Sequence, residues 1–160
     1  MGELTEALRW ITGMLTAEKI TYQIVGGLAA RGYGATRPIH DIDLFISESG
    51  LSRLYKRVEQ HVLKPPERRQ NEHFDLTRMV IEYKGQDIDI GVVEGAMIFS
   101  TEQGRWVPRM VALDDYTVLS IEGVTVPVIP LSRLLAYKRI LGRDVDLQDI
   151  QETSRSRNTR

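Results

Sequence analysis

The chain has 160 residues, of which 42 % are apolar and 27 % are charged, a composition that predicts one globular domain with a sizeable buried core. It contains no cysteine, which excludes disulfides and thiolate metal sites and fits a cytoplasmic location. Its 21 basic and 22 acidic residues nearly balance, no apolar run approaches the ~20 residues that span a bilayer, and the N-terminus lacks the basic start of a signal peptide, so we expect no membrane partner.

The first half of the chain predicts alternating helices and strands. Leu4, Leu8, Ile11 and Leu15 recur at helical spacing and predict an amphipathic helix. A short β-branched and aromatic run that ends at Gly26 predicts a buried strand. In chain order, the expected elements are a helix over 3–17, a strand over 21–25, a helix over 27–33, a strand over 41–46 and a helix over 49–62.

The second half predicts a hairpin, further strands and a closing pair of helices. Only Lys84-Gly85 separates two strands expected over 74–83 and 86–93, and a two-residue connection with glycine predicts an antiparallel hairpin. Pro130 is placed to open the first closing helix and Gly142 to end it. The other expected elements are a polar loop over 65–72, strands over 105–112 and 124–129, and a last helix over 144–153.

This order of elements predicts a mixed β-sheet flanked by helices, in an α/β or α+β fold with C-terminal helices. Residues 1–153 are expected to form a single domain. The basic stretch 154–160 is interpreted as a flexible, solvated tail rather than a nucleic-acid contact.

Asp41 and Asp43 carry the strongest chemical signal. Because successive side chains of a strand alternate, both carboxylates are expected on one face of the strand at 41–46. Two adjacent carboxylates repel unless a cation lies between them or one keeps its proton. Mg²⁺ suits them best, since it is usually held by one or two carboxylates plus substrate phosphates. The alternative is an exposed strand with two solvated acids, but a glycine pair that ends 14 residues upstream favours metal.

Asp87 and Asp89 repeat the same pattern in the strand at 86–93. If that strand lies beside the one at 41–46, one of its acids can reach the same cation. We choose Asp89 as the third ligand because it lies deeper in the apolar run. Asp87 is interpreted as a solvated acid next to the turn.

Gly26 and Gly27 stand where a strand gives way to a helix. Glycine lets the backbone approach a ligand closely and tolerates positive φ. Free amides at the start of the following helix would face a phosphate. The alternative is a tight turn without a ligand, and the downstream aspartates favour phosphate.

Three basic residues are candidates for substrate contacts. Arg37 could hold a phosphate oxygen, and His40 could either bond the substrate or cap the loop before the aspartate strand. Lys138 lies on the apolar stripe of its helix, three residues after Leu135 and three before Leu141. Its charge either snorkels to solvent or reaches the triphosphate.

Several of these segments resemble the nucleotidyltransferase superfamily related to DNA polymerase β. Within it, the likeness is to small bacterial and archaeal members, namely aminoglycoside and lincosamide nucleotidyltransferases and toxin-type members of abortive-infection systems. The residues that carry the resemblance are Val25-Gly26-Gly27, Asp41-Ile42-Asp43, Asp89 and the C-terminal run from Pro130 to Gly142 with Asp146-Leu147.

The resemblance implies roles for these positions. Gly26 and Gly27 would cradle the triphosphate, Asp41 and Asp43 would hold two Mg²⁺ (or Mn²⁺) ions, Asp89 would share one ion and help to activate the acceptor hydroxyl, and Lys138 would contact phosphate. The sequence departs from the pattern at Val145, where such members often have a basic residue. It also lacks the larger C-terminal helical domain that often covers the acceptor in antibiotic-modifying members.

The expected function is therefore metal-dependent nucleotidyl transfer. An acceptor hydroxyl on a small molecule, an RNA or a protein attacks the α-phosphorus of a nucleoside triphosphate such as ATP, and pyrophosphate leaves. The segments at 63–73 and 94–123 are expected to shape the acceptor pocket. Three alternatives stay open: a non-catalytic nucleotide-binding module of the same fold, the toxin of a toxin–antitoxin pair with an antitoxin partner, and a metal-dependent sugar transferase, against which the glycine pair argues.

Overall fold

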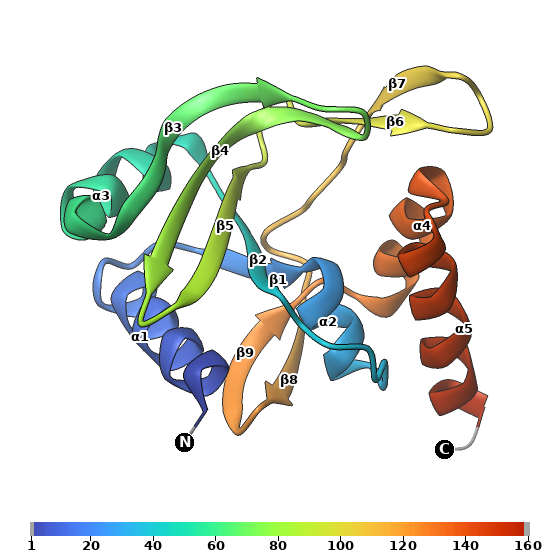
Figure 1. Cartoon of the computed structure of the whole chain (residues 1–160), viewed down its shortest axis with the longest axis horizontal. Coiled ribbons are helices and arrows are strands. Elements are labelled where there is room, and N and C mark those ends of the chain that lie inside the picture. Colours follow the sequence, from blue (N-terminus) through green and yellow to red (C-terminus); the bar gives the residue numbers. More distant parts are fainter. Residues whose placement is uncertain (1, 159–160) are drawn as a thin grey trace.

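The computed structural model describes residues 2–158, and for residues 155–158 it describes the backbone only. Its fold is a mixed sheet with helices on both sides, as the sequence predicted (Figure 1). The helices are α1 (Glu3–Ala17), α2 (Gly26–Gly32), α3 (Glu48–Val58), the 3₁₀ turn η1 (Glu59–His61), α4 (Leu131–Leu141) and α5 (Asp144–Asn158). The strands are β1 (Tyr22–Val25), β2 (Asp41–Ile46), β3 (Val62–Gln70), β4 (Phe74–Tyr83), β5 (Gln86–Val92), β6 (Met97–Ser100), β7 (Arg105–Pro108), β8 (Thr117–Ile121) and β9 (Val124–Val128).

The sheet runs in the order β7-β6-β4-β5-β2-β1-β9-β8, and β3 adds to it by pairing with β4. Strand β2 is parallel to β5, and β1 is parallel to β9, whereas the remaining pairs are antiparallel. The predicted hairpin between β4 and β5 is confirmed, and Lys84 and Gly85 both adopt positive φ at its turn. The two central strands β2 and β5 are therefore fixed side by side.

Helices cover the sheet with their apolar faces. The predicted stripe of α1 is confirmed, since Leu8, Ile11 and Leu15 are fully buried in the core. Pro130 immediately precedes α4, and Gly142 ends it at φ +61°, as expected from the proline and glycine positions. Figure 1 shows α4 and α5 standing together beside the short helix α2, away from α1 and α3. This places the C-terminal helices against the end of β1 at which the glycine pair lies.

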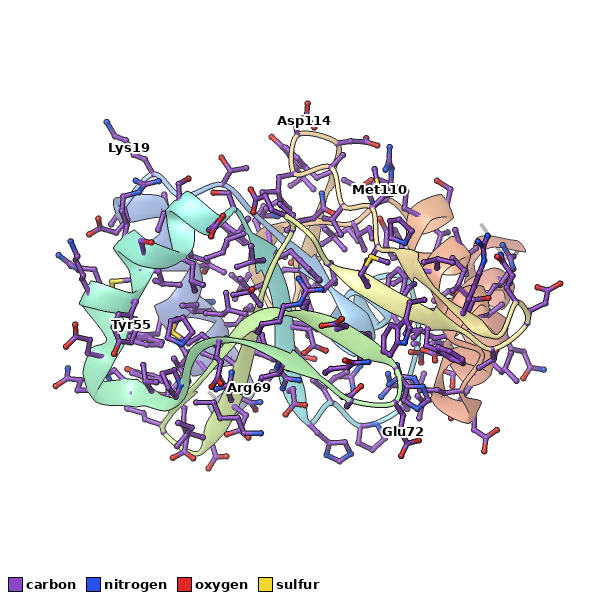
Figure 2. The ribbon with its side chains drawn as sticks, turned by 90° about the horizontal axis from the view of Figure 1, so that it is seen from above. Lys19, Tyr55, Arg69, Glu72, Met110 and Asp114 are labelled. Carbon is purple, nitrogen blue, oxygen red and sulfur yellow. The ribbon has the colours of Figure 1, made fainter. Side chains whose placement is uncertain are left out.

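The predicted polar loop over 65–72 is wrong, because most of it forms strand β3. The strand is largely exposed and pairs only with β4, so it shows no apolar alternation. Its register shifts between Lys64 and Glu67, where Pro65 and Pro66 lack an N–H for the ladder. The two strands and their connection, residues 62–83, are hereafter the β3–β4 arm; it belongs to the sheet through β4, and Figure 2 labels Arg69 and Glu72 along it.

Other boundaries differ from the predictions by smaller amounts. The predicted strand over 105–112 stops at Pro108, the helix over 49–62 stops at Val58, and the short strands β6 and β8 were missed. The last helix runs on to Asn158, so residues 154–158 of the predicted tail continue α5, and 159–160 lie outside the described residues. No helix in the described chain is both long and apolar enough to cross a bilayer.

Candidate active site

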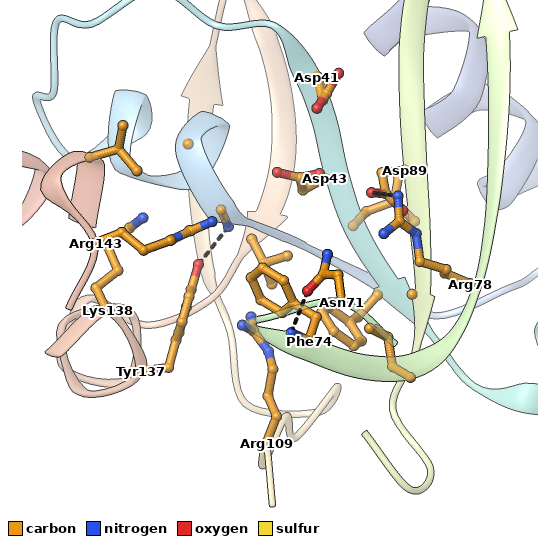
Figure 3. A pocket seen from close by; sticks show the side chains of 18 of the residues that line it. Asp41, Asp43, Asn71, Phe74, Arg78, Asp89, Arg109, Tyr137, Lys138 and Arg143 are labelled. Carbon is orange, nitrogen blue, oxygen red and sulfur yellow. Dashed lines mark hydrogen bonds and ion pairs between the residues drawn. The ribbon is translucent and has the colours of Figure 1, made fainter. Parts of the chain in front are cut away.

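The pairing of β2 with β5 brings the predicted aspartates together. Asp41 lies opposite Asp87 and Asp43 lies opposite Asp89 in this parallel register. Asp41, Asp43 and Asp89 line one cavity, as Figure 3 shows, and the volume of this cavity is about 290 Å³. The expectation that the two strands are neighbours is confirmed, and Asp87 is not among the residues that line this cavity.

Burial and mutual repulsion perturb the carboxyl groups of the cavity. Burial, followed by the charges of Asp89 and Asp41, raises the pKa of Asp43 to about 7, although Arg109 and Lys138 oppose the rise. Burial also raises the pKa of Asp89, although Arg78 opposes this. A cation bound at Asp43 would favour the ionised form of this carboxyl.

Asp89 already has a cationic partner that the sequence did not suggest. The Nη2 atom of Arg78, on β4, lies 2.9 Å from Oδ2 of Asp89. Within residues 2–158, no three acidic or histidine side chains lie close enough together to form a ready-made metal site. A metal that used Asp89 would therefore have to share this carboxylate with Arg78 or displace the arginine.

The glycine pair forms a turn, hereafter the glycine turn, against the aspartates. Gly26 has φ +67°, and a methyl group there would overlap the Asp43 carboxylate. A methyl group on Gly27 would come within 2.7 Å of Nη2 of Arg37. The Gly26 amide is not free as expected, because it donates to the hydroxyl of Tyr137 at 2.8 Å. Both glycines are needed for these close approaches.

Arg37 reaches the glycine turn but is held by an acid that the sequence analysis missed. Its Nε and Nη2 atoms donate to the two carboxylate oxygens of Asp149, on α5, at 2.7 and 2.9 Å. The hydrogen bond from Arg37 to Asp149 is the main cause that raises the pKa of this guanidinium. Asp149 is fully buried, so this bidentate ion pair ties α5 to the segment that precedes β2.

Lys138 is buried and ion-paired, so the snorkelling interpretation is wrong. It is 1 % exposed, and its Nζ atom lies 2.9 Å from Asp149 and 3.2 Å from Asp146. Burial alone would lower the pKa of Lys138, but Tyr137, Asp149 and Asp146 outweigh it and the net direction is upward. The predicted contact between Lys138 and a phosphate stays a prediction, although this residue does line the cavity.

Arg143 supplies a basic side chain near the position where Val145 departs from the superfamily pattern. Its Nε donates to Asp146 at 2.7 Å, and the side chain lines the cavity with Val145. Burial would raise the pKa of Asp146, but Arg143 and Lys138 outweigh it and lower the pKa of this carboxyl. A basic side chain therefore lines the cavity two positions upstream of Val145.

His40 lies at the outer end of the aspartate strand. It is exposed and lines a second, smaller cavity with Gly27, Arg37 and Asp41, whereas its carbonyl oxygen accepts from Gln86 at 2.9 Å. The structure therefore places His40 beside the aspartates but gives its imidazole no defined partner among the hydrogen bonds of the described residues.

The opposite side of the main cavity is built by residues that showed no motif. Phe45 follows Asp43 by two positions on β2, and Phe74 and Asn71 come from the β3–β4 arm. Arg109, just after β7, lies over the rings of Tyr137 and Phe45. Segments 63–73 and 94–123 thus both contribute to this cavity.

A mixed sheet that presents paired aspartates next to a glycine turn defines a nucleotidyltransferase-like class of protein. The chain belongs to the family described as "Nucleotidyl transferase of unknown function (DUF2204)", whose pattern matches residues 4–160. This agrees with the superfamily that the motifs resembled. No curated protein sequence matches the chain.

Solved structures share the fold at low sequence identity. A presumed nucleotidyltransferase of Thermotoga maritima has a TM-score of 0.72 and 23 % identity over 99 % of this chain and 94 % of that one. The lincosamide antibiotic adenylyltransferase LnuA, with lincomycin bound, has a TM-score of 0.62 and 17 % identity over 93 % of this chain and 95 % of its own. The enzyme ANT(2")-Ia, in complex with adenylyl-2"-tobramycin, has a TM-score of 0.63 and 15 % identity over 97 % and 90 %.

These coverages correct the expectation that the chain is shorter than antibiotic-modifying nucleotidyltransferases. The chain spans 95 % of the LnuA structure and 90 % of the ANT(2")-Ia structure, so its length does not set it apart from these two antibiotic-modifying proteins. The similarity shows a common fold, and the acceptor of this chain has to be argued from its own residues.

Proposed function

We propose that the chain is a metal-dependent nucleotidyltransferase that binds a nucleoside triphosphate, such as ATP, with Mg²⁺ or Mn²⁺. An acceptor hydroxyl attacks the α-phosphorus, a new oxygen–phosphorus bond forms, and the bond to pyrophosphate breaks. The observation that carries the proposal is the parallel pairing of β2 with β5, which sets Asp43 beside Asp89 in the cavity that the glycine turn also lines.

The residues of the cavity fit a hard divalent cation. Asp41, Asp43 and Asp89 offer carboxylate oxygens, the donors that Mg²⁺ and Mn²⁺ prefer. Burial, and after it the charges of Asp89 and Asp41, raises the pKa of Asp43, and a bound cation would favour its ionised form; Arg78 already supplies a positive charge to Asp89. When bound, the metal would stabilise negative charge on the attacking and departing oxygens.

The chain's own side chains would position the triphosphate. The glycine turn lets phosphate approach the backbone, because any side chain there would fill the space next to Asp43 and Arg37. Arg37 and Lys138 add positive charge along the same wall, and Asp149 holds both in place. We assign Asp89 to accept the proton of the acceptor hydroxyl, which requires its carboxylate to be released from Arg78.

The test is nucleotide transfer to an unknown acceptor. The protein is incubated with each labelled nucleoside triphosphate, Mg²⁺ and a cell extract, and both pyrophosphate release and labelled products are measured. Asp43→Ala should abolish transfer while circular dichroism and melting temperature show an intact fold. Normal turnover by this variant, or no transfer with any triphosphate, would contradict the proposal.

One observation favours a second candidate, a non-catalytic nucleotide-binding module. The ion pair with Arg78 engages the carboxylate of Asp89, the third acid of the site. A protein that binds a nucleotide without transferring it does not need this carboxylate to be free. Calorimetry with ATP and Mg²⁺ beside the pyrophosphate assay separates the two functions. Binding without pyrophosphate release in any extract would favour the module.

A further inference from the structure

A buried arginine without an acidic partner faces the cavity. Five basic side chains line it, and among the side chains that the structure describes, those of residues 2–154, four of the five form ion pairs with aspartates whereas Arg109 forms none. Arg109 is 6 % exposed, and its Nε and Nη2 atoms have no hydrogen-bond partner in the described chain. The next residue, Met110, labelled in Figure 2, is 76 % exposed, so the chain turns Arg109 alone inward.

The guanidinium of Arg109 lies against two aromatic rings. Its Cζ atom lies 3.7 Å from the centroid of the Tyr137 ring and 4.8 Å from that of Phe45. Its backbone amide donates to the carbonyl of Ala96 at 2.8 Å, which fixes the start of the side chain. Stacking satisfies the faces of the guanidinium but leaves the N–H groups along its edge without acceptors, which is unfavourable in a buried position.

The unpartnered edge of Arg109 has the geometry of an oxyanion clamp. Arg37 uses the same pair of atoms, Nε and Nη2, to bind both carboxylate oxygens of Asp149 at 2.7 and 2.9 Å. A planar guanidinium pairs in this bidentate way with carboxylates and phosphates. The ligand that completes Arg109 is therefore expected to carry two oxygens that share a negative charge.

Arg109 lies at the far end of the aspartate strand from Asp41, although it shares Tyr137 with the glycine turn, since the Tyr137 hydroxyl accepts from the Gly26 amide. The smaller cavity, with Gly27, Arg37 and Asp41, lies at one end of the aspartate strand. Phe45, on which Arg109 stacks, is four residues beyond Asp41 on the same strand face, a span of roughly 13 Å. Figure 3 likewise shows Arg109 and Asp41 on opposite sides of the cavity. In this arrangement, the triphosphate would lie at the end of the cavity with Gly27 and Asp41, and the acceptor would lie on the Arg109 side.

On the basis of the nucleotidyl transfer proposed above, we propose that Arg109 binds an oxyanion of the acceptor. The acceptor class is then a hydroxyl compound that also carries a carboxylate or a phosphate. The aromatic side chains Phe45 and Phe74 would enclose its carbon skeleton. A polycationic acceptor would instead meet an unpaired buried arginine, which opposes its binding.

The first experiment tests the oxyanion clamp without turnover. The protein is loaded with Mg²⁺ and α,β-methylene ATP, and acetate or inorganic phosphate is titrated while the Arg109 Nε–H resonance is followed by NMR. A saturable shift with the nucleotide analogue bound is the expected result. An absence of shift overturns the proposal. A shift that the analogue abolishes overturns it too, because Arg109 would then hold the phosphates of the nucleotide.

Arg109→Met removes the clamp but keeps an apolar side chain against the two rings. Phosphate affinity should fall about 10- to 100-fold, a larger loss than any change in affinity for the analogue, which the charge of Arg109 influences only through Asp43. The melting temperature of the ligand-free variant should equal or exceed that of the wild type, since buried unpartnered donors are lost, whereas an arginine of merely structural role would lower it. Arg105→Met, at an exposed position four residues upstream, is the matched control.

A second variant covers the case in which Arg109→Met does not fold. Arg109→Lys keeps the positive charge but loses the two parallel N–H donors of the guanidinium. This variant should therefore bind phosphate more weakly than the wild type, by at least several-fold. Equal affinity for phosphate in this variant would refute the clamp.

The last experiment identifies the acceptor. The labelled product from the extract assay is analysed by mass spectrometry after removal of the nucleotidyl group. A hydroxy acid or a phosphorylated hydroxyl compound agrees with the proposal, and a neutral or polycationic acceptor overturns it. Failure to bind the analogue or to release pyrophosphate would contradict the proposed transferase function instead, and the phosphate titration would still report on Arg109.

Discussion

Replacing Asp43 by asparagine should stabilise the metal-free protein at alkaline pH and abolish transfer. The pKa of this carboxyl is raised from 3.8 to about 7, first by burial and then by Asp89 and Asp41. Between about pH 4 and about pH 7 the folded chain therefore keeps a proton that the unfolded chain releases, and stability is lost as the pH rises through this range. Asparagine resembles the protonated acid and carries no charge at any pH.

The magnitude follows from the size of the pKa change. A rise from 3.8 to about 7 corresponds to about 4 kcal/mol if the whole effect is expressed. Because Asp43 is partly exposed and its neighbours can relax, we expect about half of this, ~2 kcal/mol, at pH 8 and less than ~1 kcal/mol at pH 5. Asp43→Asn should gain these amounts over the wild type.

Urea denaturation in EDTA at pH 5 and pH 8 measures the difference between the two proteins. Saturating Mg²⁺ provides the internal control, since it should raise the midpoint of the wild type at pH 8 and leave that of Asp43→Asn nearly unchanged. Equal free energies of unfolding for the two proteins in EDTA at pH 8 would refute the argument from burial and like charges.

Three other substitutions give separate expectations. Asp149→Asn should destabilise the fold by about 3 kcal/mol in denaturant titrations, because Arg37 and Lys138 both lose a buried counter-charge, and should weaken ATP binding measured by calorimetry. Gly26→Ala should cost at least about 1 kcal/mol, owing to its positive φ and the overlap with the neighbouring carboxylate, and should abolish nucleotide binding; a stable variant that binds ATP normally would contradict the glycine-turn assignment. Arg78→Met should free the carboxylate of Asp89 and tighten Mn²⁺ binding several-fold in electron paramagnetic resonance titrations. Unchanged or weaker Mn²⁺ binding would count against Asp89 as a metal ligand.

The centre of the site was predictable because strand alternation is a local property. Two Asp-x-Asp runs in apolar strands indicate which face each carboxylate takes, and a glycine pair before them marks the turn. The short connection at Lys84-Gly85 fixes β4 against β5. The prediction that Asp89 lies near Asp41 and Asp43 required β2 and β5 to be neighbours, and the structure shows that they are.

The charges around this centre were harder to predict because their partners are distant in the sequence. Arg37 and Asp149 are 112 residues apart, and only the docking of α5 brings them together. The sequence did contain a pattern that indicates the buried face of α5. Asp146, Asp149 and Thr153 recur at helical spacing, and all three are buried, so this face consists of polar residues. Because these residues are polar, apolar periodicity does not reveal this face.

Strand β3 and Arg109 show two further limits of local reasoning. An exposed edge strand with two prolines has neither alternation nor strand propensity, so its partner β4 alone defines it. Arg109 stands in a segment without periodicity, and a single arginine there gives no sign that it turns inward. Both features arise from tertiary packing.

The shared carboxylate of Asp149 has a consequence for biosynthesis. Ribosomes deliver the aspartates of β2 and the lysine of α4 before helix α5 leaves the exit tunnel. Until then Arg37 and Lys138 have no counter-ion from that helix, and the wall behind the glycine turn is not assembled. A nascent chain should therefore be unable to sequester nucleotides until α5 has been synthesised and has docked against α4.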